Sequence, residues 1–260
     1  MQGLGRCNHV YRLILCVFMV TSCSSEDDDG VNNDTTSNDL SESGTGEEAE
    51  SGFYDFKVDG IYYNIISDNE VEVTYETDSD IVNRGSVAEG MYQMGTTESI
   101  YSYGCYEGAV VIPSTVTWKG NTYKVTSISR ESFAYCTELE SVTIPSSIET
   151  IEDYAFEYCE SLTDIIMEEG VKTISDGAFL NCIALTCVTI PSSVTNIGIN
   201  VFSPGITDLY VLSETPPTCD NNAFSYYFRM KCTLHVPAGT LEIYEYAPGW
   251  DGFYIVEIED

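Results

Sequence analysis

A period of 23 residues runs through the middle of this 260-residue chain and limits its possible folds more than any other feature. Three kinds of apolar residue keep the same phase through successive units, with no insertion. Such regularity is typical of repeat proteins, in which each unit buries its apolar face against the next. The residues in phase are Phe133, Phe156, Phe179 and Phe202, then Cys136, Cys159 and Cys182, and finally Ile128, Ile151, Ile174 and Ile197.

Each unit has the composition of one coil of a solenoid. An apolar–polar–apolar alternation, as in Val142-Thr143-Ile144, predicts a short strand. Pro145 follows at once and ends the strand, because proline has no N–H to donate to a sheet. The segment Ala155-Phe156-x-x-Cys159 has the spacing of one short helical or 3₁₀ turn. Stacked coils of this kind, about 4.8 Å apart, would form one continuous core.

The units resemble the BspA-like leucine-rich repeats in the pattern Leu-x-x-Val-x-Ile-Pro-x-x-Val/Ile-x-x-Ile-x-x-x-Ala-Phe-x-x-Cys. The resemblance covers residues 110–224 and implies a repeat solenoid with β-rich N-terminal and C-terminal caps. It also implies a surface lipoprotein of gut or oral Gram-negative anaerobes that attaches to host matrix proteins, host cells or other bacteria. The second unit departs from the pattern, because Met167-Glu168-Glu169-Gly170 replaces Ile-Pro-Ser-Ser after the strand.

Residues 1–22 are typical of a bacterial signal peptide. Arg6 and Arg12 precede a short apolar run, which is far shorter than the roughly 20 residues that a membrane-spanning helix needs. The end of the segment, Val20-Thr21-Ser22-Cys23, resembles a lipobox, which implies cleavage before Cys23 and attachment of lipid to it. An ordinary signal peptide that leaves an incidental cysteine is the alternative.

Residues 23–51 are predicted to form a disordered acidic tether. From residue 24 onward this segment holds ten acids and no Lys or Arg, so it cannot bury enough surface to offset its ordering entropy. The four acids of Glu26–Asp29 resemble the export signal of lipoproteins displayed on the outer face of the outer membrane. This resemblance implies a lipid-anchored protein exposed at the cell surface, and a plain solvated linker is the alternative.

Atypical segments flank the repeats, as the exposed ends of a solenoid require. Asp59-Gly60 lies between two strand-like runs and predicts a hairpin, and residues 70–75 add a third strand. Residues 81–107 do not fit this pattern and look like an inserted loop rich in tyrosine. The expected divisions are an N-terminal β cap over 52–109, the solenoid over 110–212 and a C-terminal cap over 213–260.

The acidic composition excludes one class of partner. The chain has 42 Asp and Glu against 10 Lys and Arg, and its formal net charge is −32. Proteins bind a nucleic-acid backbone with clustered cations, and no run of Lys or Arg occurs here. We therefore expect no nucleic-acid partner.

Few residues in the sequence could support catalysis or hold a metal ion. His235 is the only histidine beyond the signal peptide, and we expect it to have a structural role. The CxxC pairs that zinc sites often use are absent from the sequence. We therefore expect a protein without cofactor, metal or enzymatic activity. Paired carboxylates for glycosidase chemistry are an alternative that so acidic a chain leaves open.

Seven cysteines follow Cys23, so at least one thiol is unpaired or bonds to another chain. Cys136, Cys159 and Cys182 recur at one apolar position of the repeat and are predicted to be a ladder of small buried thiols. Cys219 and Cys232 flank a turn, and a disulfide between them is a further possibility.

Two surfaces are candidates for ligand binding. The residues between the core positions of each strand would point outward and stack into a ribbon, which is the usual recognition surface of repeat proteins. Tyrosine-rich loops are the second candidate, because tyrosine offers a large contact area with a polar tip. A solvated sheet face and a loop packed on the cap are the respective alternatives. The ribbon comprises Glu140, Ser141, Thr143, Asp164, Ile166, Thr189 and Tyr210, and the aromatic loops carry Tyr101, Tyr103, Tyr106, Tyr226 and Tyr227.

Three functions are compatible with these features. The family resemblance implies a surface-anchored, non-enzymatic binding or adhesion protein that uses its solenoid to contact an extracellular protein or glycan. The second is a glycan-binding lipoprotein, or an accessory in glycan processing, that uses the tyrosine-rich loops. The third is an envelope protein whose solenoid is only a spacer. The sequence identifies no ligand.

Overall fold

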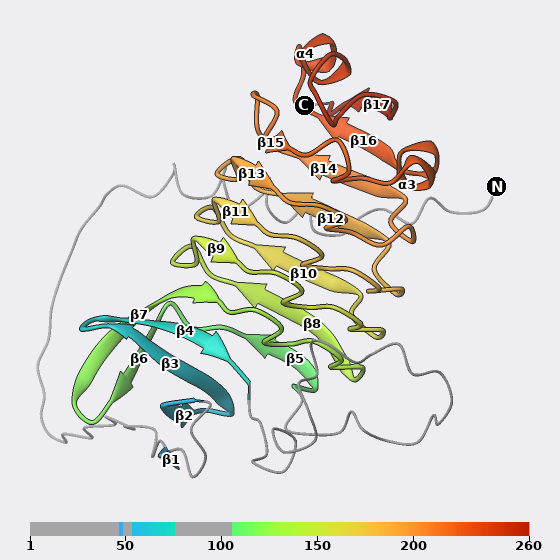
Figure 1. Ribbon diagram of the computed structural model, residues 1–260. Coiled ribbons are helices and arrows are strands. Elements are labelled where there is room, and N and C mark those ends of the chain that lie inside the picture. Colours follow the sequence, from blue (N-terminus) through green and yellow to red (C-terminus); the bar gives the residue numbers. More distant parts are fainter. Residues whose placement is uncertain (1–46, 49–53, 76–105, 260) are drawn as a thin grey trace, which may run out of the picture.

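The computed structural model describes residues 47–48, 54–75 and 106–259 (Figure 1). The predicted signal peptide, Cys23, most of the tether, Tyr101 and Tyr103 lie outside the described residues. The whole predicted repeat region lies within them. Among these residues, no helix is long and apolar enough to cross a membrane.

The N-terminal end is a small sheet that continues into the solenoid. Asp59 and Gly60 have φ angles of 50° and 82°, as a two-residue hairpin turn needs, and this confirms the predicted hairpin. The third predicted strand is present and pairs in parallel with the strand that leads into the repeats. The elements of this end are β1 (Glu47–Glu48), β2 (Phe56–Val58), β3 (Ile61–Ser67), β4 (Glu70–Thr74), β6 (Thr115–Trp118) and β7 (Asn121–Ile128).

Two series of parallel strands run along the solenoid, and each coil contributes one strand to each series (Figure 1). This arrangement confirms the predicted repeat solenoid. The short-strand ladder continues from β7 through β9 (Thr150–Ile151), β11 (Thr173–Ile174), β13 (Asn196–Ile197) and β15 (Thr218–Cys219). The long-strand ladder comprises β5 (Gly108–Val111), β8 (Leu139–Ile144), β10 (Asp164–Met167), β12 (Cys187–Ile190), β14 (Asp208–Val211), β16 (Thr233–Val236) and β17 (Tyr254–Glu257).

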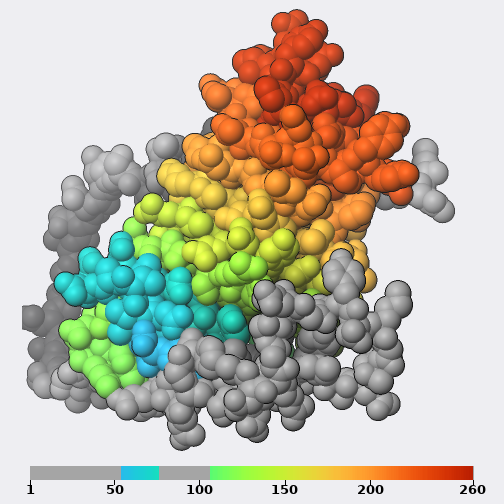
Figure 2. Space-filling model, in the orientation of Figure 1, coloured from blue at the N-terminus to red at the C-terminus, as the bar shows by residue number. Residues whose placement is uncertain are grey.

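The long-strand ladder is divided into two sheets. β5, β8 and β10 form the first, and β12, β14, β16 and β17 form the second. β10 and β12 are in contact, but these two strands form no ladder of backbone hydrogen bonds. The side chains of successive coils nevertheless pack directly against one another (Figure 2).

A column of stacked phenylalanine rings fills the core between the two ladders. The centroids of Phe133 and Phe156 lie 4.6 Å apart, and those of Phe156 and Phe179 lie 5.1 Å apart. The spacing grows to 5.6 Å between Phe179 and Phe202 and to 6.5 Å between Phe202 and Phe224. All five side chains are buried. The 23-residue phase therefore stacks the first four rings, and Phe224 continues the column from the next coil.

The cysteine position of the repeat is buried, as predicted, but it is not a uniform row of thiols. Cys159 and Cys182 are free, and each thiol lies 3.0 Å from the carbonyl oxygen of a phenylalanine in the preceding coil. Cys136 is disulfide-bonded, so the prediction of three free thiols is wrong at this coil. Four of the described cysteines are free, which agrees with the expected unpaired thiol.

The predicted helical or 3₁₀ turn is instead a series of separate turns. Hydrogen bonds of the 3₁₀ type are present, for example from the amide of Cys159 to the carbonyl of Phe156. Two residues per coil have positive φ and interrupt any continuous helix, as Tyr154 does at 56° and Tyr158 at 58°. The same phase recurs at Glu131, Tyr135, Gly177, Asn181 and Asn200.

The unusual second unit links its two neighbours. The carboxylate of Glu168 accepts a hydrogen bond from the amide of Ser146 in the first unit. Glu169 accepts hydrogen bonds from the amide and hydroxyl of Ser192 and from the amide of Ser193, at 2.9–3.0 Å. These contacts join the second coil to the third at the end of β10, where the strand ladder is interrupted.

The C-terminal cap closes the core with aromatic residues and two short helices. Trp250 is fully buried and its indole N–H donates to the carbonyl of Pro217. Cys219 and Cys232 are both free, so the suggested disulfide is wrong. They belong to different sheets, because β15 ends the short-strand ladder whereas Cys232 precedes β16 of the other. The helices are α3 (Tyr226–Lys231) and α4 (Leu241–Glu245).

Candidate functional site

The predicted ribbon exists as a set of outward side chains in register along the long-strand ladder. Ser141 pairs with Asp164 and Thr143 with Ile166 between β8 and β10. Thr189 pairs with Tyr210 between β12 and β14. The core positions on the same strands are buried, as in the alternation of half-buried and buried residues in β10. We call this surface the ladder face, and its members are Glu140, Ser141, Thr143, Asp164, Ile166, Thr189, Tyr210 and His235.

Exposure differs strongly along the ladder face. Glu140 is exposed, whereas Asp164, Ile166 and Tyr210 are half-buried. Thr189 is only 6% exposed, and its hydroxyl has no hydrogen-bond partner. The face is therefore solvated unevenly along its length.

His235 belongs to the ladder face, which the sequence reasoning missed. Its ring stacks on Tyr210 with centroids 4.1 Å apart and planes 6° from parallel. Its Nε2 lies 2.8 Å from Oδ1 of Asp208, whose other oxygen accepts a hydrogen bond from Thr207. His235 is in register with Tyr210 across β14 and β16. The sequence offered little indication of this, because 25 residues, rather than the 23 of the repeat, separate Tyr210 from His235.

The aromatic residues predicted for loops occupy different environments. Tyr106 is buried, and its hydroxyl donates to the carbonyl of Thr74 and accepts a hydrogen bond from the amide of Tyr62. It therefore packs on the cap and is not a binding tyrosine. Tyr226 and Tyr227 lie in helix α3 rather than in a loop, because Ser225 caps the helix at its N-terminus. Their side chains are 70% and 72% exposed.

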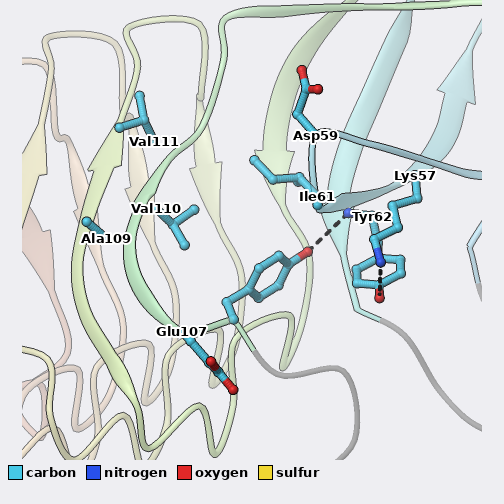
Figure 3. Close-up of a pocket in the computed structure, with 10 residues that line it drawn as sticks. Lys57, Asp59, Ile61, Tyr62, Glu107, Ala109, Val110 and Val111 are labelled. Atoms are coloured by element: carbon cyan, nitrogen blue, oxygen red, sulfur yellow. Dashed lines mark hydrogen bonds between the residues drawn. The ribbon is translucent and has the colours of Figure 1, made fainter. Parts of the chain in front are cut away.

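An open hollow of about 490 Å³ lies between the N-terminal hairpin and the first strand of the long-strand ladder (Figure 3). Ile61 of β3 and Val110 of β5 lie on opposite sides of it. The ammonium group of Lys57 is held by the hydroxyl of Tyr62 at 2.9 Å and lies over the ring at 4.5 Å. The hollow joins residues distant in sequence, so no sequence pattern predicted it.

The described residues offer little for nucleophilic or metal chemistry. Burial raises the pKa of Cys232 to about 12, and the nearby charge of Asp208 adds to the effect. Burial also raises the pKa of Cys219 to about 11. Both thiols are thus protonated at neutral pH, and the thiolate is the nucleophilic form. No group of three or more His, Cys, Asp or Glu within the described ranges could hold a metal ion.

Comparison with known proteins agrees with the geometry of the coils. Residues 124–247 match six copies of the BspA type leucine rich repeat region. A leucine-rich repeat protein of T. pallidum has a TM-score of 0.50 and 22% identity, with 81% of each chain covered. One from Bacteroides capillosus has a TM-score of 0.45 and 26% identity, covering 60% of this chain and 96% of that one. No curated protein matches.

The family match follows from the same features that build the ladders. The matched region begins in β7 and ends beyond α4, so it includes every described coil from β8 to β16. The leucine, isoleucine, phenylalanine and cysteine positions of its coils are buried in one core. Residues 124–247 of this chain are thus a run of BspA type leucine rich repeats.

Proposed function

We propose that this chain is a non-enzymatic binding protein of the bacterial cell surface, anchored in the outer membrane by a lipid on Cys23. Its ligand is a host matrix protein, a host cell or another bacterium, and the ladder face is the contact surface. Proteins with BspA-type repeats are typically cell-surface proteins. The lipobox-like sequence at Cys23 and the acidic segment behind it support the anchor.

The ladder face is the observation that carries this proposal. Its side chains are held in register by parallel strands, so they form a preorganised surface that loses little entropy on binding. It combines apolar contact area from Ile166 and Tyr210 with polar groups from Ser141 and Asp164. Extended surfaces of this kind are what repeat proteins use to bind other macromolecules.

An array of matrix proteins and glycans, probed with the full chain, tests the proposal. For a captured ligand, we expect Ile166→Ser to weaken binding about tenfold, as the loss of a central apolar contact does. Ile199→Ser is the control, because Ile199 is an isoleucine at the surface, 37% exposed, that lies outside the long-strand ladder. Equal binding by the two variants would show that the ladder face is not the contact surface.

Cell fractionation tests the anchor separately. Cys23→Ala should move the protein from the membrane to the soluble fraction, because no acyl chain can then be attached. Ser22→Ala keeps a small residue before the cysteine and should leave the protein in membranes. Membrane association of Cys23→Ala would contradict lipid anchoring at this residue.

A second candidate function is glycan binding by the tyrosines of α3. Tyr226 and Tyr227 are highly exposed and form an edge-to-face pair with centroids 5.9 Å apart. Glycan signals on the array that disappear in Tyr226→Ala/Tyr227→Ala, but persist in Ile166→Ser, would favour this candidate. Formation of a shortened glycan during incubation would point to processing instead of binding.

A further inference from the structure

The side of the molecule that carries the long-strand ladder has an unbalanced charge. Its strands and adjoining turns hold ten Asp and Glu and no Lys or Arg. Glu138, Glu140 and Glu160 lie at or before the starts of strands and are exposed. The segments counted are 106–114, 137–146, 160–169, 183–192, 205–212, 232–237 and 253–259.

The short-strand ladder is also acidic, with Glu149, Glu152 and Asp176 in or beside its strands, but it carries cations as well. Lys124 in β7 forms an ion pair with Glu149 at 3.5 Å, and Arg130, just after β7, forms one with Glu131 at 3.2 Å. Lys172 lies directly before β11. The lack of any Lys or Arg, rather than acidity alone, therefore distinguishes the long-strand side.

An apolar row lies within the acidic surroundings. Val111 is 68% exposed and in register with Thr143, which is in register with Ile166. Tyr210 and His235 continue the row in the second sheet. Val111 is exposed, whereas Ile166 and Tyr210 are half-buried, so the row offers some apolar contact area to a partner.

A buried polar group in the same row has no internal hydrogen-bond partner. The hydroxyl of Thr189 lacks a hydrogen-bond partner, although the residue is 94% buried between the coils of Ile166 and Tyr210. Nearly all buried polar groups in proteins are hydrogen-bonded, because leaving one unpaired is costly. The alternation of β12 directs this side chain to the ladder face, since Val188 and Ile190 fill the core.

We infer that the ladder face binds a basic, extended polypeptide segment of its partner. The apolar side chains of that segment lie along the row from Val111 to Tyr210, and its Lys or Arg side chains reach the carboxylates at the starts of the strands. A polypeptide fits better than a polysaccharide, because it supplies cationic and apolar groups on one extended chain. This inference rests on the proposed function of the ladder face.

Synthetic peptides of twelve residues test the inference with the full chain in low salt. An alternating Lys–Val peptide should bind more tightly than alternating Lys–Ser or Glu–Val peptides. Removal of three carboxylates in Glu138→Gln/Glu140→Gln/Glu160→Gln should weaken Lys–Val binding about tenfold, at roughly 0.5 kcal/mol for each exposed charge. The control Glu214→Gln/Glu242→Gln/Glu245→Gln removes three exposed charges of the C-terminal cap and leaves the tether unchanged.

The outcomes separate this inference from the proposed function. Weakening by the ladder-face triple alone, together with weakening by Ile166→Ser, supports the inference. Equal weakening of binding by the two triple variants would show that the partner is not recognised by its basic side chains. Weakened binding of any peptide to Ile166→Ser would still support the ladder face as the contact surface. Unchanged binding in all variants would overturn both. Circular dichroism confirms that each variant is folded before binding is measured.

Discussion

The two ladders are built by the same coils around one core, yet they present very different surfaces. The strands of the short-strand ladder have two residues each in the coils, so each offers one outward side chain, as Thr150 and Thr173 do. The strands of the long-strand ladder have four to six residues and offer at least two. Strand length therefore decides how much of a coil can vary without disturbing the core.

The inward residues of the two ladders contribute to stability, whereas the outward residues of the long-strand ladder are the ones proposed to contact a partner. Ile151 and Ile174 on one ladder and Val142 and Ile165 on the other are all buried, so the inward residues of both ladders do the same work. The outward residues differ in charge and polarity, with ion pairs near the short strands and unbalanced carboxylates near the long ones. We expect changes in the core to affect both ladders and changes at the ladder face to affect binding.

Phe156→Ala gives the strongest test of the shared core. The ring is fully buried between Phe133 and Phe179, so its removal should lower the free energy of unfolding by about 3–5 kcal/mol. Hydrogen exchange should show reduced protection in both ladders. Loss of protection in only one ladder would show that the two are separate cooperative units. Ile166→Ser at the ladder face should cost less than about 1 kcal/mol.

Glu169→Ala tests what holds the long-strand ladder together at its interruption. The carboxylate makes three hydrogen bonds to Ser192 and Ser193, beside strands β10 and β12 that are not paired with each other. We expect a loss of about 1–2 kcal/mol in denaturant unfolding. Glu168→Ala is the control, because that carboxylate makes one such bond, to Ser146, and its loss should cost less. Equal losses would mean that the interruption needs no extra support.

Glu157→Gln should have a smaller effect of opposite sign that depends on pH. Burial raises the pKa of Glu157, and the charge of Glu131 adds to the effect. Folding thus favours the protonated form of Glu157. The stability gained from this is present below the ordinary pKa of 4.5, and it is lost as the pH rises through the raised pKa of the folded protein. The neutral glutamine should therefore stabilise the protein at pH 7. Thermal unfolding at pH 7 and at about pH 4 measures the difference, which should vanish at the lower pH.

Lys124→Ala should change stability least. Its ion pair with Glu149 spans 3.5 Å, and the two side chains are 46% and 60% exposed. Exposed pairs of this kind contribute roughly 0–1 kcal/mol, so we expect a loss below about 0.5 kcal/mol in urea unfolding. A loss above 1 kcal/mol would show that the ion pairs of the short-strand ladder carry stability, and the separation drawn between the ladders would need revision.

The solenoid could be predicted from the sequence because its determinants are local and repeated. The phase of phenylalanine and isoleucine fixes which side chains enter the core, and Asp59-Gly60 fixes the hairpin of the cap. The separate turns of each coil were not predicted, since Glu131 and Tyr154 adopt positive φ although neither is a usual turn residue. Stacking on the next coil, rather than local preference, holds them there.

The ladder face could be predicted in part. The alternation within each strand identified Thr143, Ile166 and Tyr210 as outward residues, and their pairing is as expected. His235 was missed because the coil before it is longer than the period. The role of Tyr106 depends on contacts with Tyr62 and Thr74, more than 30 residues away in sequence. The departure of the second unit at residues 167–170 lies beside the interruption between β10 and β12, but the sequence did not show that the strands would be unpaired there.

The phenylalanine column loosens toward the C-terminal cap, although the strands beside it stay paired. The first pair of rings is 4.6 Å apart, and the last pair, Phe202 and Phe224, is 6.5 Å apart. The strands of these last two coils are nevertheless hydrogen-bonded on both ladders. Dispersion between stacked rings falls steeply with distance, so the first coils gain more from the column than the last coils do. The aromatic residues of the C-terminal cap, Trp250 among them, therefore close the end of the solenoid at which the column itself contributes least.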